Sequence, residues 1–173
     1  LNLPMVDEHY YEKPEWFLTN NNRYDSYYRK KAKVYVGEYA SRGNTLFNAL
    51  AEAAYMTSLE RNGDIVAMAS YAPLLANQHH TSWNPNLIYF TNSKVVPTVN
   101  YYVQNLFSNN SGDTYYPNVV KWSGNKQEND TTVAYSCVVD SKTKNIFIKL
   151  VNASSTIRTA EILLPGKGSS VGK

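Results

Sequence analysis

The chain has 173 residues, with 17 Lys and Arg against 14 Asp and Glu, which gives a net charge of +3. Hydrophobic residues make up 43% and charged residues 18%, a balance that excludes a disordered chain and allows one domain or slightly more. No apolar run approaches the roughly 18 residues of a membrane span, and no stripe of Lys and Arg indicates a nucleic-acid-binding surface. The single cysteine, Cys137, excludes an internal disulfide and a cysteine-based metal cage.

Aromatic residues are abundant, with 15 Tyr, 5 Phe and 3 Trp. A tyrosine has a flat apolar ring and a polar tip, which suits a surface that meets sugars. Tyrosine also has a high propensity for β-sheet faces, and this structural interpretation holds for most individual tyrosines.

The first segments predict alternating strands and helices. The run Met5–Tyr10 is typical of the end of a strand, and a strand with no preceding partner leads us to expect a chain cut from a longer protein. Spacings of three and four residues predict a short helix over Tyr24–Lys31. The β-branched and aromatic content of Lys33–Tyr39 predicts a strand.

A long helix and a buried strand follow. Apolar residues recur at helical intervals over Thr45–Arg61, and Asn62-Gly63 is a stop signal. The nearly continuous apolar run Asp64–Tyr71 predicts a strand that is buried on both faces. After a polar loop, one more helix is expected with Pro97 in its first turn. This order is the βαβ pattern of α/β proteins.

Beyond residue 108 the pattern changes to all-β. Three strands are predicted at Thr131–Val139, Ile146–Val151 and Thr156–Leu164, separated by polar turns. We therefore expect an α/β part over residues 1–108 and an all-β part over residues 109–173.

Glu38 is the strongest candidate for catalysis. Period-two alternation predicts that Val34, Val36 and Glu38 share one strand face. Valines followed by a carboxylate at the carboxyl end of the strand are typical of a catalytic acid at the mouth of a parallel barrel. Gly37 would allow a backbone or ligand to approach closely. The alternative is a strand-end glutamate that simply emerges into water.

Other polar and aromatic residues are predicted at the same edge. His9 ends the first strand, where it could bind a substrate hydroxyl or orient a carboxylate, or be a structural histidine. Tyr10 and Tyr11 follow with hydroxyls and stacking faces. Trp83-Asn84 lies after the third strand, and a Trp beside an amide is common in sugar recognition, although a Trp taken in isolation more often fills a loop.

Other chemistries have weak support. The adjacent pair His79-His80 has no nearby acids to complete a zinc site, so no metal is expected. No glycine-rich phosphate loop and no nucleophile elbow are present in the sequence.

Six separate motifs, in order, resemble the retaining α-L-arabinofuranosidases of glycoside hydrolase family fifty-one. The similarity is specific over residues 5–107, and the motifs are Asp7–Tyr11, Val36–Ala40, Ala49–Met56, Leu59–Asp64, Met68–Leu74 and Trp83–Pro85.

The resemblance implies a fold and a reaction. The fold class is α/β plus all-β, with the last three βα units of a (β/α)₈ barrel followed by a C-terminal β-sandwich. A whole barrel needs about 250 residues, so this chain would supply strands only near residues 4–8, 34–38 and 64–71. Glu38 corresponds to the nucleophile, and no segment of this sequence matches the motif of the acid/base Glu. His9, Tyr10, Tyr11, Trp83 and Asn84 match residues that contact the sugar.

The resemblance also implies partners and location. We expect arabinose-containing polysaccharides or oligosaccharides as substrates, no cofactor, no nucleic acid and no membrane. A secreted or periplasmic bacterial protein is expected, with any signal peptide outside this sequence. The chain alone is predicted to be inactive because retaining hydrolysis needs two carboxyl groups. Exposed strand edges lead us to expect association into a homo-oligomer.

Two alternatives remain open at this point. One is a non-catalytic carbohydrate-binding β-sandwich module with a barrel remnant. The other is a retaining glycosidase of different sugar specificity on the same scaffold.

Overall fold

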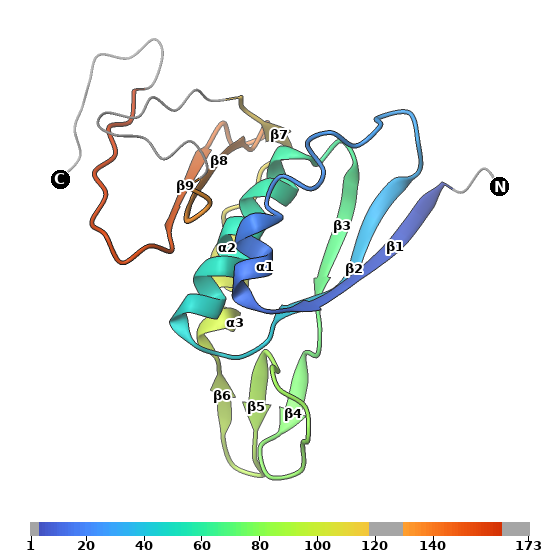
Figure 1. Cartoon of the computed structure of the whole chain (residues 1–173), viewed down its shortest axis with the longest axis vertical. Coiled ribbons are helices and arrows are strands. Elements are labelled where there is room, and N and C mark those ends of the chain that lie inside the picture. Colours follow the sequence, from blue (N-terminus) through green and yellow to red (C-terminus); the bar gives the residue numbers. More distant parts are fainter. Residues whose placement is uncertain (1–3, 118–129, 164–173) are drawn as a thin grey trace.

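The computed structural model describes residues 4–117 and 130–163. A parallel sheet of three strands forms the first layer, in the order β1 (Met5–Glu12), β2 (Lys33–Ser41) and β3 (Val66–Tyr71). The helices α1 (Pro14–Thr19) and α2 (Leu46–Arg61) lie together on one side of this sheet (Figure 1). The three predicted strands and their parallel connections are therefore confirmed.

Helix α2 is specified by its ends. The Thr45 side chain accepts a hydrogen bond from the Asn48 amide, and the Asn48 side chain accepts one from the Thr45 amide, which completes a capping box. Arg61 occupies the last turn, where a cation is favourable beside the helix dipole. The predicted helix over Thr45–Arg61 is confirmed, with Thr45 as its N-cap.

Two smaller sheets complete the described fold. The strands β4 (Leu75–Asn77), β5 (Ile88–Phe90) and β6 (Val95–Pro97) form a sheet beyond the carboxyl end of β3 (Figure 1). Helix α3 (Val99–Asn109) then returns beside α2.

The antiparallel sheet of β7 (Thr114–Tyr115), β8 (Val133–Val139) and β9 (Ile146–Asn152) packs against α2. Figure 1 shows the helices between this sheet and the parallel sheet.

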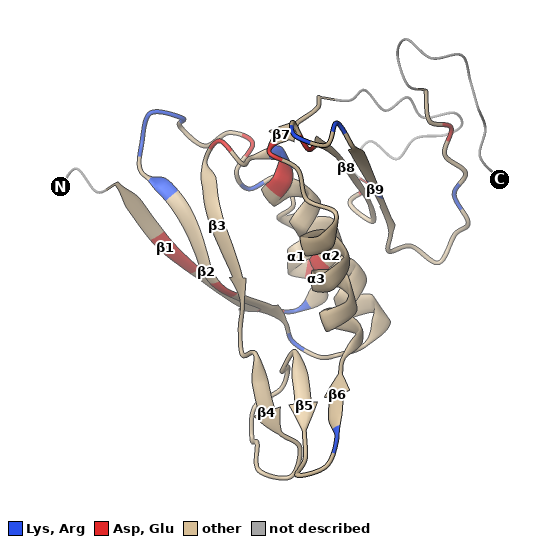
Figure 2. Cartoon of the chain, turned by 180° about the vertical axis from the view of Figure 1, so that it is seen from behind, with Lys and Arg blue, Asp and Glu red and all other residues tan. Residues whose placement is uncertain are grey.

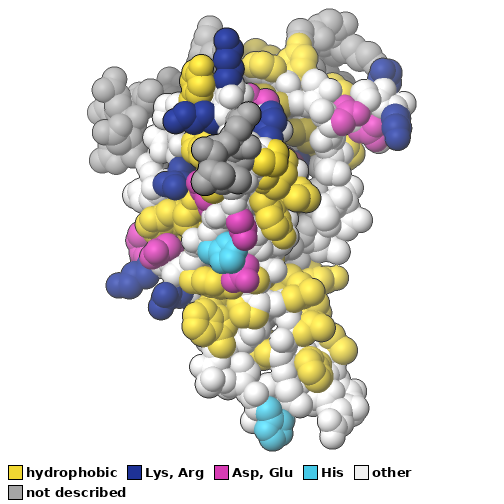
Figure 3. All heavy atoms as spheres, turned by 90° about the vertical axis from the view of Figure 1, so that its right-hand side faces the viewer, with side chains coloured by type: hydrophobic (Ala, Val, Ile, Leu, Met, Phe, Trp, Pro, Cys, Tyr) yellow, Lys and Arg dark blue, Asp and Glu magenta, His cyan; other side chains and the backbone are white. Residues whose placement is uncertain are grey.

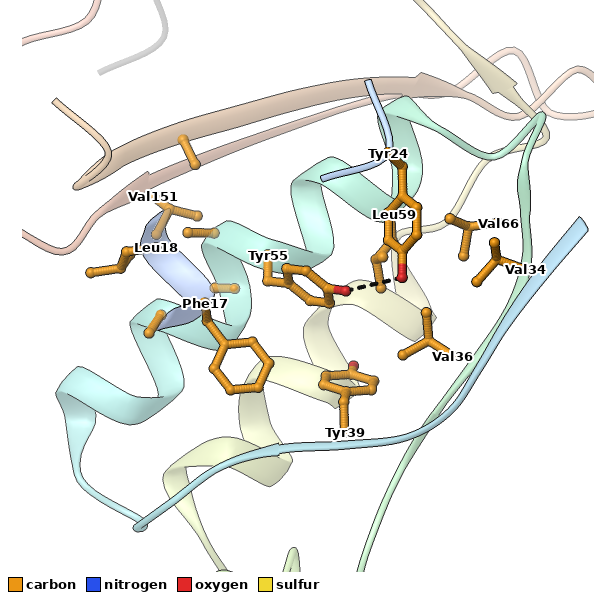
Figure 4. Packing of buried hydrophobic residues seen from close by; sticks show 14 of the residues in the cluster. Phe17, Leu18, Tyr24, Val34, Val36, Tyr39, Tyr55, Leu59, Val66 and Val151 are labelled. Atoms are coloured by element: carbon orange, nitrogen blue, oxygen red, sulfur yellow. Dashed lines mark hydrogen bonds between the residues drawn. The ribbon is translucent and has the colours of Figure 1, made fainter. Parts of the chain in front are cut away.

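Aromatic side chains dominate the core between the parallel sheet and the helices. Phe17, Tyr39 and Tyr55 contact one another with ring centroids 5.3–6.5 Å apart. The Tyr55 hydroxyl donates to the Tyr24 hydroxyl at 3.3 Å (Figure 4), and Tyr24 donates to the Glu8 carboxylate at 2.8 Å. The hydroxyls of Tyr24 and Tyr55 are thus paired, which avoids the cost of leaving these two polar groups unsatisfied.

The all-β part shares this core. Val151 of β9 and Ala134 of β8 belong to the same buried cluster as the aromatic residues. Lys149 forms an ion pair with Glu60 of α2 at 2.6 Å, and both side chains are largely buried. Ser136 also donates to Glu60 at 2.5 Å. The boundary near residue 108 remains a prediction, but the two parts pack as neighbours on α2.

The predicted helix over Tyr24–Lys31 is wrong. The helix begins earlier, at Pro14, and residues 20–26 form successive turns. Tyr24 is fully buried, whereas Arg29 donates to the carbonyl oxygens of Tyr24 and Tyr27 at 2.7 and 3.2 Å. The Tyr24 carbonyl also accepts from the Tyr27 amide at 3.1 Å, which is a turn bond between residues three apart and not the bond of an α-helix.

Other boundaries are also corrected. The segment 72–97, expected as a polar loop before a helix, contains β4, β5 and β6, and Pro97 ends β6 while Thr98 caps α3. The strand predicted over Thr156–Leu164 is not observed in residues 156–163, and residue 164 lies outside the described residues. Ile157 is 93% exposed, and the alternating segment 156–163 pairs with no strand among the described residues.

The prediction that the third strand is buried on both faces is also wrong. Val66 is buried, but Met68 is 52% exposed. The helices cover one face of the parallel sheet, and the other face is open in the described part of the chain (Figure 2).

Glu52 of α2 is a buried carboxyl that gives a test of this packing. It is fully buried and accepts a hydrogen bond from the Ser41 amide at 2.8 Å. Burial raises the pKa of Glu52 to about 8, and the hydrogen bond from the Ser41 amide opposes this effect only in part. Between about pH 4.5 and 8, Glu52 is therefore protonated in the folded state and ionised in the unfolded state.

We predict that Glu52→Gln flattens the pH dependence of stability. Stability of the wild type should fall as pH rises from about 4.5 towards 8, because only the unfolded chain ionises freely in that range. The variant should therefore be more stable above pH 8, by on the order of a few kcal/mol, with a smaller difference near pH 5. Thermal unfolding across this range measures the effect. The exposed Glu15→Gln control should follow the wild type, and parallel profiles for Glu52→Gln and wild type would contradict the prediction.

Candidate active site

A bulge in β2 sets the direction of Glu38. Glu8 of β1 pairs with Val36, but the next residue, His9, pairs with Glu38, so Gly37 is the extra residue in β2. Val36 and Tyr39 both enter the core beneath the helices, whereas Glu38 is half exposed and contacts side chains of β1 on the other face.

The predicted shared face of Val34, Val36 and Glu38 is therefore wrong. The two valines are fully buried in the core, in contact with the helical layer. Strict alternation would place the carboxylate beside them, but the extra residue Gly37 turns it to the open face.

Alternation in β1 brings the partners of Glu38 to this open face. Asp7, His9 and Tyr11 occupy every second position, and their side chains are linked to one another and to Glu38. In Figure 2 the acidic positions of β1 and β2 lie on neighbouring strands. Figure 3 shows the molecule from the side of β1, with a histidine between acidic side chains and apolar surface around them.

Glu38 is held through one carboxylate oxygen. The Tyr11 hydroxyl donates to Oε2 at 2.5 Å, and His9 Nδ1 lies 3.7 Å from the same oxygen. Burial, followed by the hydrogen bond to Glu38, raises the pKa of Tyr11 to about 12, so the hydroxyl stays protonated as a donor. No hydrogen bond from the described residues reaches Oε1 of Glu38.

Trp83 forms an aromatic wall beside Tyr11. The two rings meet edge to face with centroids 5.4 Å apart, and Trp83 is 44% exposed. The buried Asn86 donates to the Trp83 carbonyl at 2.6 Å, and Asn44 donates to the Asn86 carbonyl at 3.2 Å. Asn84 is exposed next to Trp83. Within the described residues, its side chain makes no hydrogen bond to the rest of the site.

Tyr10 does not join this group. Its ring lies 4.8 Å from Trp16 and 6.3 Å from Tyr55, centroid to centroid, and its hydroxyl donates to Glu8. Tyr10 therefore faces the helices because adjacent residues of a strand point to opposite faces. The structure brings Glu38, His9, Tyr11 and Trp83 together and places Tyr10 in the packing.

Three residues of this site were missed from the sequence. Asp7 bonds His9, and Asn86 and Asn44 support Trp83. The spacing of Asp7, His9 and Tyr11 at every second position was a signal that could have identified Asp7. Asn44 and Asn86 are far apart in sequence, and no local pattern links them.

The described residues offer no metal centre. No group of three or more His, Cys, Asp or Glu side chains among residues 4–117 and 130–163 is arranged to hold an ion. His79 and His80 are exposed in the turn after β4. In the same part of the chain, no helix has the length and apolar character that crossing a membrane requires.

Comparison with known proteins identifies the family. Residues 18–170 match the model of the α-L-arabinofuranosidase C-terminal domain. An extracellular exo-α-L-arabinofuranosidase of Streptomyces chartreusis is 58% identical over 116 residues, which is 67% of this chain and 14% of that protein. α-L-Arabinofuranosidase 1 of Arabidopsis thaliana is 34% identical over 172 residues, which is 95% of this chain and 24% of that protein.

Solved structures agree with this assignment. The arabinose-bound α-L-arabinofuranosidase MgGH51 matches with a TM-score of 0.81 and 34% identity, over 88% of this chain and 26% of that one. The Thermotoga maritima α-L-arabinofuranosidase has 15% identity and a TM-score of 0.65 over 86% of this chain and 38% of that one, which shows a shared fold.

The chain belongs to the α-L-arabinofuranosidases of glycoside hydrolase family 51 and corresponds to their C-terminal portion. It spans about 14% to 24% of the length of the two curated relatives described above.

Proposed function

We propose that this chain is the C-terminal portion of a retaining α-L-arabinofuranosidase and that Glu38 is its nucleophile. The observation that carries the proposal is the Glu38 carboxylate, half exposed on the open face of the sheet and held through Oε2 by Tyr11 at 2.5 Å. A nucleophile must present a free oxygen in a fixed direction. The homologues are arabinofuranosidases by name, which supports the same class of substrate here.

The parallel sheet has the layout expected of part of a (β/α)₈ barrel. We propose that β1, β2 and β3 are the last three barrel strands and that the sheet β7–β8–β9 belongs to the C-terminal β-sandwich. Glu38, Tyr11 and Trp83 lie at or beyond the carboxyl ends of strands, which is where active sites of such barrels form. Helices cover only the face opposite Glu38.

The proposed reaction uses Glu38 twice. Its Oε1 attacks the anomeric carbon of the arabinofuranosyl unit, while a second carboxylic acid protonates the oxygen of the leaving group. The second group then takes a proton from water, whose oxygen displaces Glu38 from the anomeric carbon and releases arabinose. Because no segment of this sequence matches the acid/base motif, that second carboxyl comes from outside this chain.

Tyr11 and Trp83 have separate proposed roles. The Tyr11 hydroxyl keeps its hydrogen bond to Oε2 when Oε1 becomes the ester oxygen, so it orients the nucleophile throughout. Trp83 offers a stacking face to the sugar, with His9 and Asn84 as donors or acceptors for its hydroxyls. We omit Tyr10 from the sugar contacts because its ring packs on Trp16.

The proposed substrates are arabinofuranosyl side chains of arabinan or arabinoxylan. The Streptomyces relative is described as extracellular and exo-acting, and an arabinose complex is known for MgGH51. These descriptions support removal of terminal units by a secreted enzyme. Self-association remains a proposal that light scattering can test.

We predict that Glu38→Ala in the full-length enzyme lowers kcat on an aryl α-L-arabinofuranoside by about 10⁴-fold or more, because the covalent step is lost. Added azide should restore turnover by entering the space left by the carboxylate, and the product should be the β-arabinofuranosyl azide. Proton NMR of the product measures this configuration, and Glu15→Gln serves as a control of full activity. Retention of activity by Glu38→Ala would favour the carbohydrate-binding module as the function of this chain.

A second prediction concerns Tyr11→Phe, which removes only the hydroxyl that bonds Glu38. Loss of one hydrogen bond to a charged group costs about 1.5–3 kcal/mol, so kcat should fall about 10- to 100-fold. The Trp83 contact involves the ring, so KM should change little. An unchanged kcat would show that Oε2 needs no donor.

A third prediction is that the 173-residue chain alone releases no measurable arabinose from the same substrate, because one carboxyl of the pair is absent. Chromogenic assay of the purified chain against the full-length enzyme tests this. Turnover by the chain alone that Glu38→Ala abolishes would place the second carboxyl within these residues.

A further inference from the structure

Gly37 provides the space in which the Asp7 carboxylate lies. A Cβ added at Gly37 would lie 2.1 Å from Asp7 Oδ1 and 2.9 Å from its Cγ. Positive φ is found among the described glycines only at Gly43, so the backbone of Gly37 is one that other residues adopt. The glycine at position 37 is therefore explained by the Asp7 side chain and not by backbone conformation.

The seated Asp7 carboxylate contacts His9. Asp7 Oδ2 lies 2.9 Å from His9 Nε2, a distance at which Nε2 carries a proton and donates it. His9 Nδ1 then faces Oε2 of Glu38 at 3.7 Å. The charged groups that face the imidazole are Asp7 on its own strand and Glu38 on β2, and the Tyr11 hydroxyl bonds the same Glu38 oxygen.

We propose that Asp7, held in the space left by Gly37, is a positioning residue that fixes the His9 ring with Nδ1 towards Glu38. The proposal deepens the proposed function and rests on it, because the orientation matters for catalysis only if Glu38 is the nucleophile. In a histidine, the hydrogen bond at one ring nitrogen decides whether the other nitrogen presents a proton or a lone pair. Asp7 acts on Glu38 through the His9 ring, without direct contact between the two carboxylates.

A surface ion pair alone would not support this role. Exposed pairs contribute little to stability, and both Asp7 and His9 are about half exposed. The additional observation is that the Asp7 carboxylate occupies the space beside Gly37 of β2, where any side chain would collide with it. The residue that makes this space is also the bulged residue that turns Glu38 to the open face.

A double-mutant cycle in the full-length enzyme tests the proposal. Asp7→Ala should lower kcat about 10- to 100-fold and change KM by less than about threefold. Gly37→Ala should cause a similar loss by displacing the carboxylate. In the Asp7→Ala background, Gly37→Ala should cost nothing further, since the atoms that it would strike are absent. Glu15→Gln is the matched control for removal of an exposed carboxylate.

The outcomes of the cycle separate a positioning role from a structural one. If Asp7→Ala leaves kcat within twofold of the wild type, the proposal is wrong. It is also wrong if Gly37→Ala lowers kcat equally in both backgrounds, because Gly37 would then act through the backbone. Should Gly37→Ala fail to fold, Asp7→Asn replaces it, and the same loss of kcat is expected with an unchanged unfolding temperature.

Histidine NMR distinguishes failure of this inference from failure of the proposed function. The chain has 3 histidines, so ¹⁵N-histidine labelling gives few ring signals, and His9→Asn assigns those of His9. Asp7→Ala should remove the signature of a protonated Nε2 from His9 and leave His79 and His80 unchanged. Unchanged His9 signals overturn the inference. Altered His9 signals together with full activity of Glu38→Ala overturn the proposed function alone.

Discussion

The register of β1 against β2 determines which side chains meet at the candidate site. Up to Glu8 and Val36 the two strands advance together, and one extra residue at Gly37 then moves Glu38 beside His9. The same shift lets Val36 and Tyr39 both pack beneath the helices. With Val36 in the core, a strand without the bulge would place both the carboxylate and the Tyr39 ring on the wrong face, because side chains of a regular strand alternate. The extra residue Gly37 thus allows Val36 and Tyr39 to lie in the core while Glu38 lies on the open face.

The core that fixes this register is built from rings and their hydroxyls. Tyr55, Tyr24 and Glu8 form a hydrogen-bonded chain from α2, through the turn after α1, to β1. Desolvation raises the pKa of Tyr55 well above its ordinary value, so the chain stays neutral apart from the carboxylate. Such networks specify one packing arrangement because each unpaired member would be costly. The abundance of tyrosine in the sequence therefore serves the core as well as the site.

Sequence patterns predicted the long elements well and the short ones poorly. The 16 residues of α2 include many apolar helix formers and begin with a capping box, and β1, β2 and β3 carry enough β-branched or apolar residues to be recognised. The strands β4, β5 and β6 have 3 residues each, too few for alternation to be read. The segment 156–163 alternates but is exposed without a partner strand among the described residues. Alternation is a local signal, whereas strand pairing is decided by distant residues.

The candidate site was predicted through the resemblance more than through patterns. Glu38, His9, Tyr11 and Trp83 do meet in space, as the resemblance implies. Tyr10 was included with His9 and Tyr11 because all three match the sugar-contacting strand end of the family, yet neighbours in a strand face apart. Strict alternation also gave the wrong face for Glu38, because a bulge is visible in sequence only as a glycine, which has many other uses.

The wall made by Trp83 is attached to the protein differently from the rest of the site. Its carbonyl is tied through Asn86 to Asn44, in the segment that leads into α2, and not to the strands that carry Glu38 and Tyr11. The hydrogen bonds that hold Trp83 and Glu38 therefore run to different segments, although the Trp83 ring also contacts Tyr11. Under the proposed function, a sequence change around Asn44 would alter the sugar contact at Trp83 and leave the hydrogen bond between Tyr11 and Glu38 in place.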